Sequence, residues 1–171
     1  MSSTKQIIYE TSKRLFLEEG YNVGSRKIAK IAGVNQGLIT YYFKNKKNIA
    51  IMVLREIYEI VSSYVRYQVS PEKDTFLYIL TCTTLSIKSC KYEPRLLRLI
   101  NQFSKENLLE ESIRLGNNQT SLYKKVIEDN MPPNGYSLEK NFDIVIGIVY
   151  GAVRNLLLRM HENKNYEFTI E

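Results

Sequence analysis

The sequence contains only one histidine, His161, and two cysteines, Cys82 and Cys90, among 171 residues. The cysteines lie eight residues apart, without a CxxC pair or a neighbouring histidine, so we expect buried free thiols and no metal site. No Ser/His/Asp or Cys/His set and no phosphate loop is present, and with one histidine most general-base schemes lack a candidate. The sequence therefore argues against an enzyme, and we expect no catalytic residues and no cofactor.

Glycine and proline are scarce, with eight and four residues, which leaves no long linker. Long apolar segments are absent too. The longest run without a charged residue covers residues 75–87, shorter than the roughly 18–20 residues that span a bilayer. The first residues, Met-Ser-Ser-Thr-Lys-Gln, form no apolar signal core. We expect a cytoplasmic protein without a membrane partner.

The net charge of +6 is confined to the N-terminal part of the chain. Residues 1–50 contain nine lysines and arginines and three glutamates, whereas residues 51–171 contain 15 basic and 15 acidic residues. A polyanion such as DNA is the natural partner of such a segment, and a solvated basic face is the alternative.

Apolar residues recur at helical spacing along the chain and no strand pattern competes, which predicts an all-α protein. A first helix is expected from about residue 4 to Glu19, ended by Gly20. Ser25 is the expected N-cap of a short second helix that Gly33 closes, and Asn35 is the expected cap of a third helix over residues 36–43.

Beyond Asn45, the next expected cap, a long helix is predicted over residues 46–69. Its expected inward stripe is Ile49, Val53, Ile57, Ile60 or Val61, and Tyr64. Ser70-Pro71 is expected to start a fifth helix that reaches about Lys91, and Glu93-Pro94 a sixth. One or two helices are expected over residues 106–130, followed by a loop at residues 131–135.

The last predicted helix, residues 138–163, is apolar on every side between residues 144 and 153. Such a helix must be covered on every face, by the monomer on one side and by a second subunit on the other. A central core helix of a monomer is the alternative. The expected homodimer interface comprises Ile144, Gly147, Ile148, Gly151 and Ala152.

The two short helices around Gly33 form a helix-turn-helix pattern, which places the second helix in the DNA major groove. Packing should leave its polar face outward. Gln36 can then bond a base edge, Gly37 admits close approach of the backbone, and Leu38 can touch a thymine methyl. Thr40 and Tyr41 offer hydroxyls to phosphates, and Lys46 lies in the first turn of the following helix, where a phosphate also binds.

Over residues 7–49 the sequence resembles the tetracycline-repressor (TetR) family. The resemblance is carried by Leu15-Phe16, Glu19-Gly20-Tyr21, Ile28-Ala29, Ala32-Gly33-Val34, Gly37, Tyr41-Tyr42-Phe43 and Lys44-Asn45-Lys46. It implies a homodimer, usually a repressor, whose larger C-terminal domain binds a small molecule and whose last helices form the dimer interface. The segment between Tyr21 and Ile28 is one residue short, Thr40 stands where the family often has a phosphate-binding Tyr, and Asn48 replaces an acid.

We therefore predict a helix-turn-helix DNA-binding domain over residues 1–47 and a helical ligand-binding and dimerisation domain over residues 48–171. The predicted function is a ligand-released homodimeric repressor that binds a palindromic operator in double-stranded DNA. The alternatives are a helical protein-interaction adaptor and an enzyme. The expected DNA-binding residues are Ser25, Arg26, Lys27, Asn35, Gln36, Gly37, Leu38, Thr40, Tyr41, Tyr42 and Lys46. The effector is unidentified, and its expected aromatic lining, which could equally be plain core, is Tyr64, Tyr67, Tyr78, Phe103 and Tyr123.

Overall fold

The computed structural model describes residues 3–114, 117–130 and 138–163, and these residues form helices joined by turns, without a strand. The expected all-α class is confirmed. The expected loop at residues 131–135 lies outside the described residues. The helices are α1 (Ser3–Glu19), α2 (Ser25–Ile31), α3 (Gly37–Phe43), α4 (Lys46–Arg66), α5 (Thr75–Tyr92), α6 (Pro94–Lys105), α7 (Leu108–Arg114), α8 (Asn117–Asn130) and α9 (Leu138–Glu162).

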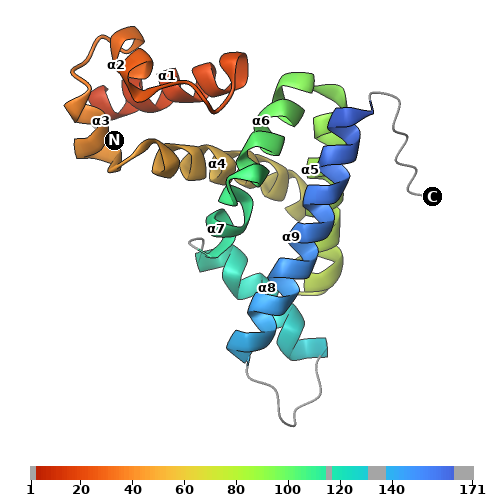
Figure 1. Ribbon diagram of the computed structural model, residues 1–171. Coiled ribbons are helices and arrows are strands. Elements are labelled where there is room, and N and C mark those ends of the chain that lie inside the picture. The colour runs from red at the N-terminus through yellow and green to blue at the C-terminus, as the bar shows by residue number, and fades with distance from the viewer. Residues whose placement is uncertain (1–2, 115–116, 131–137, 164–171) are drawn as a thin grey trace.

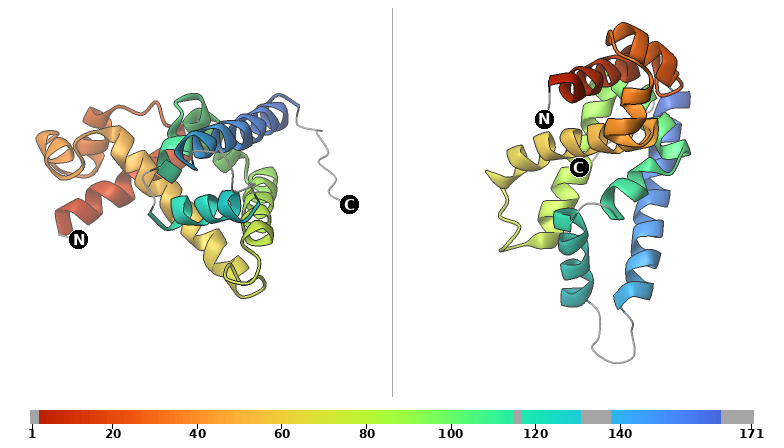
Figure 2. Two further views of the ribbon diagram at one scale, coloured as in Figure 1. Left: turned by 90° about the horizontal axis from the view of Figure 1, so that it is seen from below. Right: turned by 90° about the vertical axis from the view of Figure 1, so that its left-hand side faces the viewer.

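The short helices α1–α3 lie at one end of the molecule, and α4 runs from them into the larger group formed by α5–α9 (Figures 1 and 2). Helix α4 packs against α1 and α3 through its first half, and it also packs against α5 and α7. One buried cluster joins α1–α4 with α6 and α9, including Phe16, Ile39, Ile49, Leu99 and Leu157. Each such side chain contributes roughly 1.5–3 kcal/mol when fully buried. Helix α4 therefore joins the two groups, together with α6, which also packs against α1.

Helix α6 anchors the end of α1. The Arg98 Nη2 atom donates hydrogen bonds to the carbonyl oxygens of Leu17, at 3.0 Å, and Glu18, at 2.8 Å. These carbonyls belong to the last turn of α1, which has no further turn to accept from. Gln102 Oε1 accepts from the Tyr21 N–H at 2.6 Å, directly after Gly20, whose φ of +94° ends the helix as expected.

Two helix starts differ from the expected ones. Gly24, and not Ser25, occupies the N-cap of α2, and no side chain caps this end. Helix α5 begins at Thr75, four residues beyond Pro71, because the Asp74 carboxylate accepts from the Leu77 N–H at 2.8 Å. The Ser70 hydroxyl donates to Glu72 Oε2 at 2.8 Å, so the Ser-Pro pair forms a turn. Pro94 begins α6 as expected, and residues 108–114 and 117–130 form α7 and α8.

The predicted inward stripe of α4 is confirmed only for its first residues. Ile49 and Val53 are buried and Ile57 is half-buried, but Ile60 and Tyr64 are 64% and 62% exposed. The helix ends at Arg66, before the expected residue 69. Its last turns are covered on a different face, where Ser62 and Val65 are buried. The expected stripe assumed one straight packing face, whereas α4 meets different neighbours at its two ends.

Candidate DNA-binding surface and effector cavity

The start of α3 presents a small polar surface. The Asn35 Oδ1 atom accepts a hydrogen bond from the Gly37 N–H at 2.8 Å, but the N-cap of α3 is Gln36, without a side-chain cap, so the cap expected at Asn35 is one residue too early. Asn35, Gln36 and Gly37 are exposed. Gly37 is free of tight neighbours apart from Asn35 Oδ1, so its backbone is accessible from outside.

The two faces of α3 separate as the sequence predicts. Ile39 and Phe43 are buried against the core, while Thr40 and Tyr41 point outward and the Tyr41 side chain is 78% exposed. Leu38 and Tyr42 are half-buried, and the Tyr42 ring lies 4.9 Å from the Tyr41 ring in an edge-to-face arrangement. That contact restricts the Tyr41 side chain while its hydroxyl stays in solvent.

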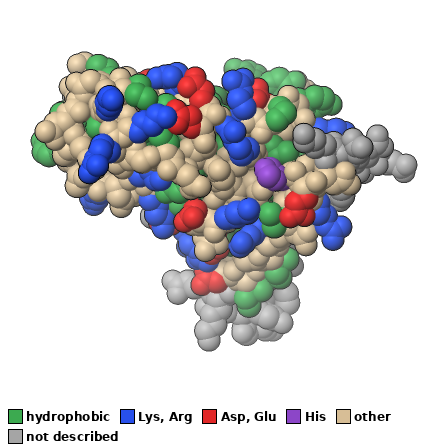
Figure 3. Space-filling model, turned by 45° about the horizontal axis from the view of Figure 1, so that its top comes forward, with side chains coloured by type: hydrophobic (Ala, Val, Ile, Leu, Met, Phe, Trp, Pro, Cys, Tyr) green, Lys and Arg blue, Asp and Glu red, His purple; other side chains and the backbone are tan. Residues whose placement is uncertain are grey.

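Helix α2 contributes charge beside this surface. Arg26 and Lys30 are exposed, and so is Lys44, which ends α3 with a φ of +66°. Lys27 Nζ lies 2.5 Å from the Glu19 carboxylate, which offsets part of its charge, and Ser25 is half-buried. Figure 3 shows lysine and arginine side chains spread over the part of the molecule that α1–α3 form.

Lys46 has a contact that the sequence analysis did not foresee. Its Nζ atom donates to the carbonyl oxygens of Tyr21, at 2.7 Å, and Val23, at 3.3 Å, and lies 4.1 Å from the centre of the Tyr21 ring. Burial lowers the pKa of this ammonium, and the charge of Glu106 opposes the shift. The lysine therefore holds the segment before α2, and its phosphate contact stays a prediction.

Asn45 and Asn48 fix the junction between α3 and α4. Asn45 Oδ1 accepts from the Asn48 N–H at 2.9 Å, so the expected cap of α4 is confirmed. The Asn48 amide in turn donates to the Phe43 carbonyl oxygen at 2.8 Å. A carboxylate cannot donate this bond. Asn48 therefore replaces the usual acid with a contact that ties the end of α3 to α4.

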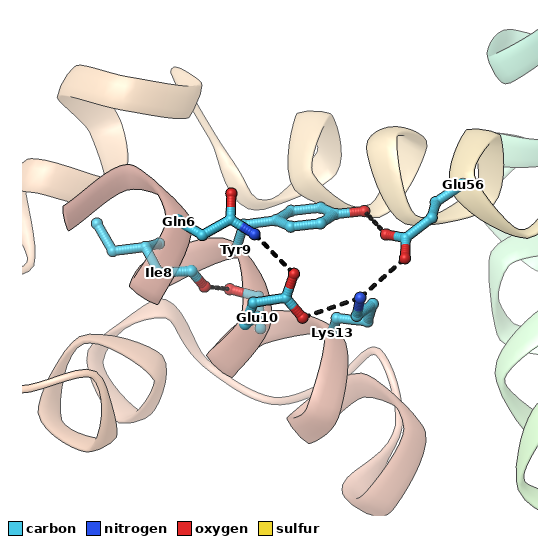
Figure 4. A network of polar contacts seen from close by, with 7 residues as sticks. Gln6, Ile8, Tyr9, Glu10, Lys13 and Glu56 are labelled. Atoms are coloured by element: carbon cyan, nitrogen blue, oxygen red, sulfur yellow. Dashed lines mark hydrogen bonds and ion pairs between the residues drawn. The ribbon is translucent and has the colours of Figure 1, made fainter. Parts of the chain in front are cut away.

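A polar network joins α1 to the middle of α4 (Figure 4). The Tyr9 hydroxyl donates to Glu56 Oε2 at 2.5 Å, and Lys13 Nζ lies 2.9 Å from Glu56 Oε1 and 2.9 Å from Glu10. These bonds lower the pKa of Glu56, the Tyr9 hydrogen bond most, while burial is the largest cause of the raised pKa of Tyr9. The carboxylate is thus charged at neutral pH and connects the two helices.

A cavity of about 130 Å³ lies between α4–α9. From α4 it is lined by Leu54, two residues before Glu56, and by Ile57, Tyr58 and Val61, which follow Glu56. The remaining lining residues are Thr83, Ser86, Ile87, Ser89, Cys90, Leu96, Ile100, Leu109, Ser112, Ile113, Tyr123, Val149, Tyr150, Val153 and Leu157. The same helix that packs on α3 therefore also forms one wall of this cavity.

Of the five aromatic residues expected to line a ligand site, Tyr123 lies in the cavity wall. Tyr78 and Phe103 are buried elsewhere in the core, whereas Tyr64 and Tyr67 are exposed, Tyr67 by 88%. The sequence analysis missed Tyr58 and Tyr150. Spacing could have found them, because Tyr58 stands between Leu54 and Val61, and Tyr150 between Ile146 and Val153, at helical intervals.

The exposed side of α9 carries the residues expected at a dimer interface. Ile146 and Leu157 point into the monomer core, whereas the other side presents five exposed residues: Ile144, Gly147, Ile148, Gly151 and Ala152. A Cβ atom added at either glycine would have open space around it. The helix is therefore not covered on all sides by its own chain.

Within the described residues, no group of three or more His, Cys, Asp or Glu side chains is placed to hold a metal ion. Cys82 and Cys90 are buried free thiols, and burial raises the pKa of Cys90 to about 11. Among the described helices, none has the length and apolar character needed to cross a membrane.

The fold and this surface define a class: all-helical proteins with an N-terminal helix-turn-helix and a larger helical region that encloses a cavity. Residues 8–52 match the family model described as bacterial regulatory proteins, tetR family. The N-terminal quarter of the chain is therefore similar to the segment that this model describes in tetR-family regulatory proteins. No curated protein matches the sequence.

Solved structures share the fold along nearly the whole chain. The fatty acid degradation regulator FadR from Bacillus halodurans is 17% identical, with a TM-score of 0.58 over 98% of this chain and 89% of that one. FadR from Thermus thermophilus, a TetR-family repressor solved in complex with lauroyl-CoA, is 15% identical, with a TM-score of 0.58 over 97% of each chain. A TetR-family protein from Vibrio parahaemolyticus is 18% identical, with a TM-score of 0.55 over 98% and 90%. These identities show the fold alone.

Proposed function

We propose that this protein is a homodimeric repressor that binds a palindromic operator and is released by a small molecule. The observation that carries the proposal is the placement of α4. Its first turn is tied to α3 through Asn45 and Asn48, and its later residues line the cavity. A molecule in the cavity contacts the helix that positions the DNA reader.

In this proposal α3 reads the major groove. Gln36 bonds a base edge, Gly37 allows the backbone close to the DNA, and the half-buried Leu38 touches a thymine methyl. Thr40 and Tyr41 contact phosphates together with the exposed Arg26, while Ser25, Asn35 and Tyr42 support these contacts. We assign Lys46 to positioning, because its ammonium already bonds two backbone carbonyls.

The second subunit covers α9. Ile144 and Ile148 stand four residues apart on its exposed side, and Gly147 and Gly151 leave room for a helix to approach closely. Exposed apolar faces of this kind mark interfaces between proteins. A symmetric pair of α3 helices then meets two half-sites, about 34 Å or one DNA turn apart.

Release follows from the double role of α4. Effector binding favours the α4 position that best fits the filled cavity, and this position changes the spacing of the two α3 helices. The effector shifts the equilibrium only by its difference in affinity for the two states. The Thermus FadR structure with lauroyl-CoA supports a ligand-responsive function for a protein of this fold.

Selection from a random duplex library, followed by fluorescence anisotropy on the enriched sequence, tests the proposal. We expect salt-sensitive binding that Tyr41→Ala weakens at least about tenfold. Tyr92→Ala is the matched control, because Tyr92 is another highly exposed tyrosine, at the end of α5. Failure to enrich any sequence, or equal loss in both variants, would contradict the proposal.

A further inference from the structure

The lining of the cavity has a definite chemical character. None of the described residues that line it is charged, and most are aliphatic. The polar groups in the wall are the hydroxyls of three tyrosines, three serines and one threonine, and the Cys90 thiol. An ion placed here would lose its hydration without meeting an opposite charge.

The serine and threonine hydroxyls in the cavity wall already donate their protons in hydrogen bonds. Each donates to a carbonyl oxygen of its own helix: Ser86 to Cys82 at 2.8 Å, Ser89 to Leu85 at 2.9 Å, Thr83 to Ile79 at 2.9 Å and Ser112 to Leu109 at 2.7 Å. A hydroxyl has one proton and two lone pairs, so the three serine oxygens can still accept a hydrogen bond, whereas Thr83 also interacts with Tyr123. This part of the wall therefore favours a ligand that donates.

The tyrosine hydroxyls are also engaged. Tyr123 interacts with both Tyr150 and Thr83, and Tyr58 interacts with the thiol of Cys82. Burial is the largest cause of the raised pKa of all three tyrosines, so each is neutral in the physiological range. In a pair of hydroxyls only one proton is left to donate outward. A carboxylate or phosphate, which only accepts, would meet mainly lone pairs.

We propose that the effector is a neutral, mainly apolar molecule about the size of one aromatic ring, and that it carries a hydroxyl that donates to the wall. That the bound molecule acts as an effector rests on the proposed function, whereas its expected chemistry is inferred from the cavity lining alone. The size follows from the volume: apolar cavities of about 150 Å³ bind benzene, and this cavity measures about 130 Å³.

Three small molecules of similar shape but different charge test whether the cavity prefers a neutral ligand. Benzyl alcohol, benzoate and benzylammonium are titrated by calorimetry into the full-length protein without DNA at pH 7. We expect benzyl alcohol to bind at least about tenfold more tightly than either ion. Benzoate or benzylammonium binding as tightly as the alcohol, or no binding of the alcohol, would overturn the proposal.

Two variants locate the binding. Ser86→Leu fills part of the cavity and removes one acceptor, so we expect it to abolish binding of benzyl alcohol; Ser86→Val serves if the larger variant does not fold. The matched control is Ser63→Leu, because Ser63 is exposed on α4 and its hydroxyl also donates to a carbonyl of its own helix, at 2.9 Å from Ile60. Unchanged binding in a folded Ser86 variant would place the probe elsewhere and refute the assignment.

The outcome separates this inference from the proposed function. If benzyl alcohol binds with the expected preference but leaves DNA binding unchanged, the cavity chemistry stands and ligand-controlled release fails. If the protein binds DNA but not benzyl alcohol, the proposed DNA binding through α3 is supported and the inference of a neutral ligand fails.

Discussion

The Tyr9 hydroxyl on α1 donates a 2.5 Å hydrogen bond to Glu56 on α4, 47 residues away in the sequence. Glu56 directly precedes Ile57 and Tyr58, which line the cavity, and Lys13 completes the network from α1. A charged carboxylate accepting from a buried phenol makes a stronger contact than a neutral pair. The network thus fixes α1 to the part of α4 next to the cavity.

Tyr9→Phe keeps the buried ring and removes only this hydrogen bond. We expect the free energy of unfolding to fall by about 1 kcal/mol, below the roughly 1.5–3 kcal/mol of a bond to a charged group, because Glu56 is partly solvated. Chemical denaturation measures it. Tyr92→Phe is the control, since that side chain is 82% exposed. An unchanged midpoint in Tyr9→Phe would show that the bond contributes nothing.

The network also predicts a pH dependence of stability. The pKa of Glu56 is lowered in the folded protein, so its contribution is complete above the unfolded value of about 4.3 and is lost as the pH falls through the lower folded value. The difference in unfolding free energy between the natural protein and Glu56→Gln should therefore be constant from pH 7 to about 5 and shrink below about 4. A difference that grows on acidification would contradict the assigned direction.

A substitution of Lys46 distinguishes a positioning role of this side chain from a direct contact with a DNA phosphate. We expect Lys46→Met to lower the melting temperature, because the carbonyls of Tyr21 and Val23 lose their donor, and to leave the salt dependence of DNA binding unchanged. Loss of a phosphate contact would instead reduce the slope of log K against log salt by about 1. Arg26→Met is the comparison variant, since Arg26 is exposed. A reduced slope in Lys46→Met would restore the phosphate contact predicted from the sequence.

Ile148→Glu tests the dimer face of α9. Ile148 is 67% exposed, so the substitution should leave the folded monomer intact and place charges at the proposed interface. Sedimentation at micromolar concentration should then show a monomer where the natural protein is a dimer. Ile60→Glu changes an equally exposed isoleucine on α4 and should remain dimeric. Dissociation of both variants, or of neither, would place the interface elsewhere.

Local signals in the sequence predicted helices α1–α3 and the start of α4 well. The cap at Asn45, the left-handed Gly20 and the buried Ile39 and Phe43 all depend on near neighbours, which a sequence displays directly. The predicted start of α5 was wrong because two polar residues four positions apart, Ser70 and Asp74, compete as caps, and the turn contacts of Ser70 decide between them.

The cavity and the inward turn of Lys46 depend on contacts between distant segments. Tyr58, Tyr123 and Tyr150 come from three helices, and only their packing shows that they share one wall. Lys46 reaches carbonyls more than 20 residues away, at a position where helix-terminus rules alone predict a phosphate. Periodicity shows that a residue faces inward, but it does not show what that residue meets.

The central claim is that two copies of this chain read one duplex through their α3 helices. Hydroxyl-radical footprinting on the selected sequence, with the stoichiometry measured by sedimentation, tests it most directly. We predict two protected patches related by two-fold symmetry, with centres about 34 Å apart, and two protomers bound to each duplex. A single asymmetric patch, or one protomer on each duplex, would contradict the account.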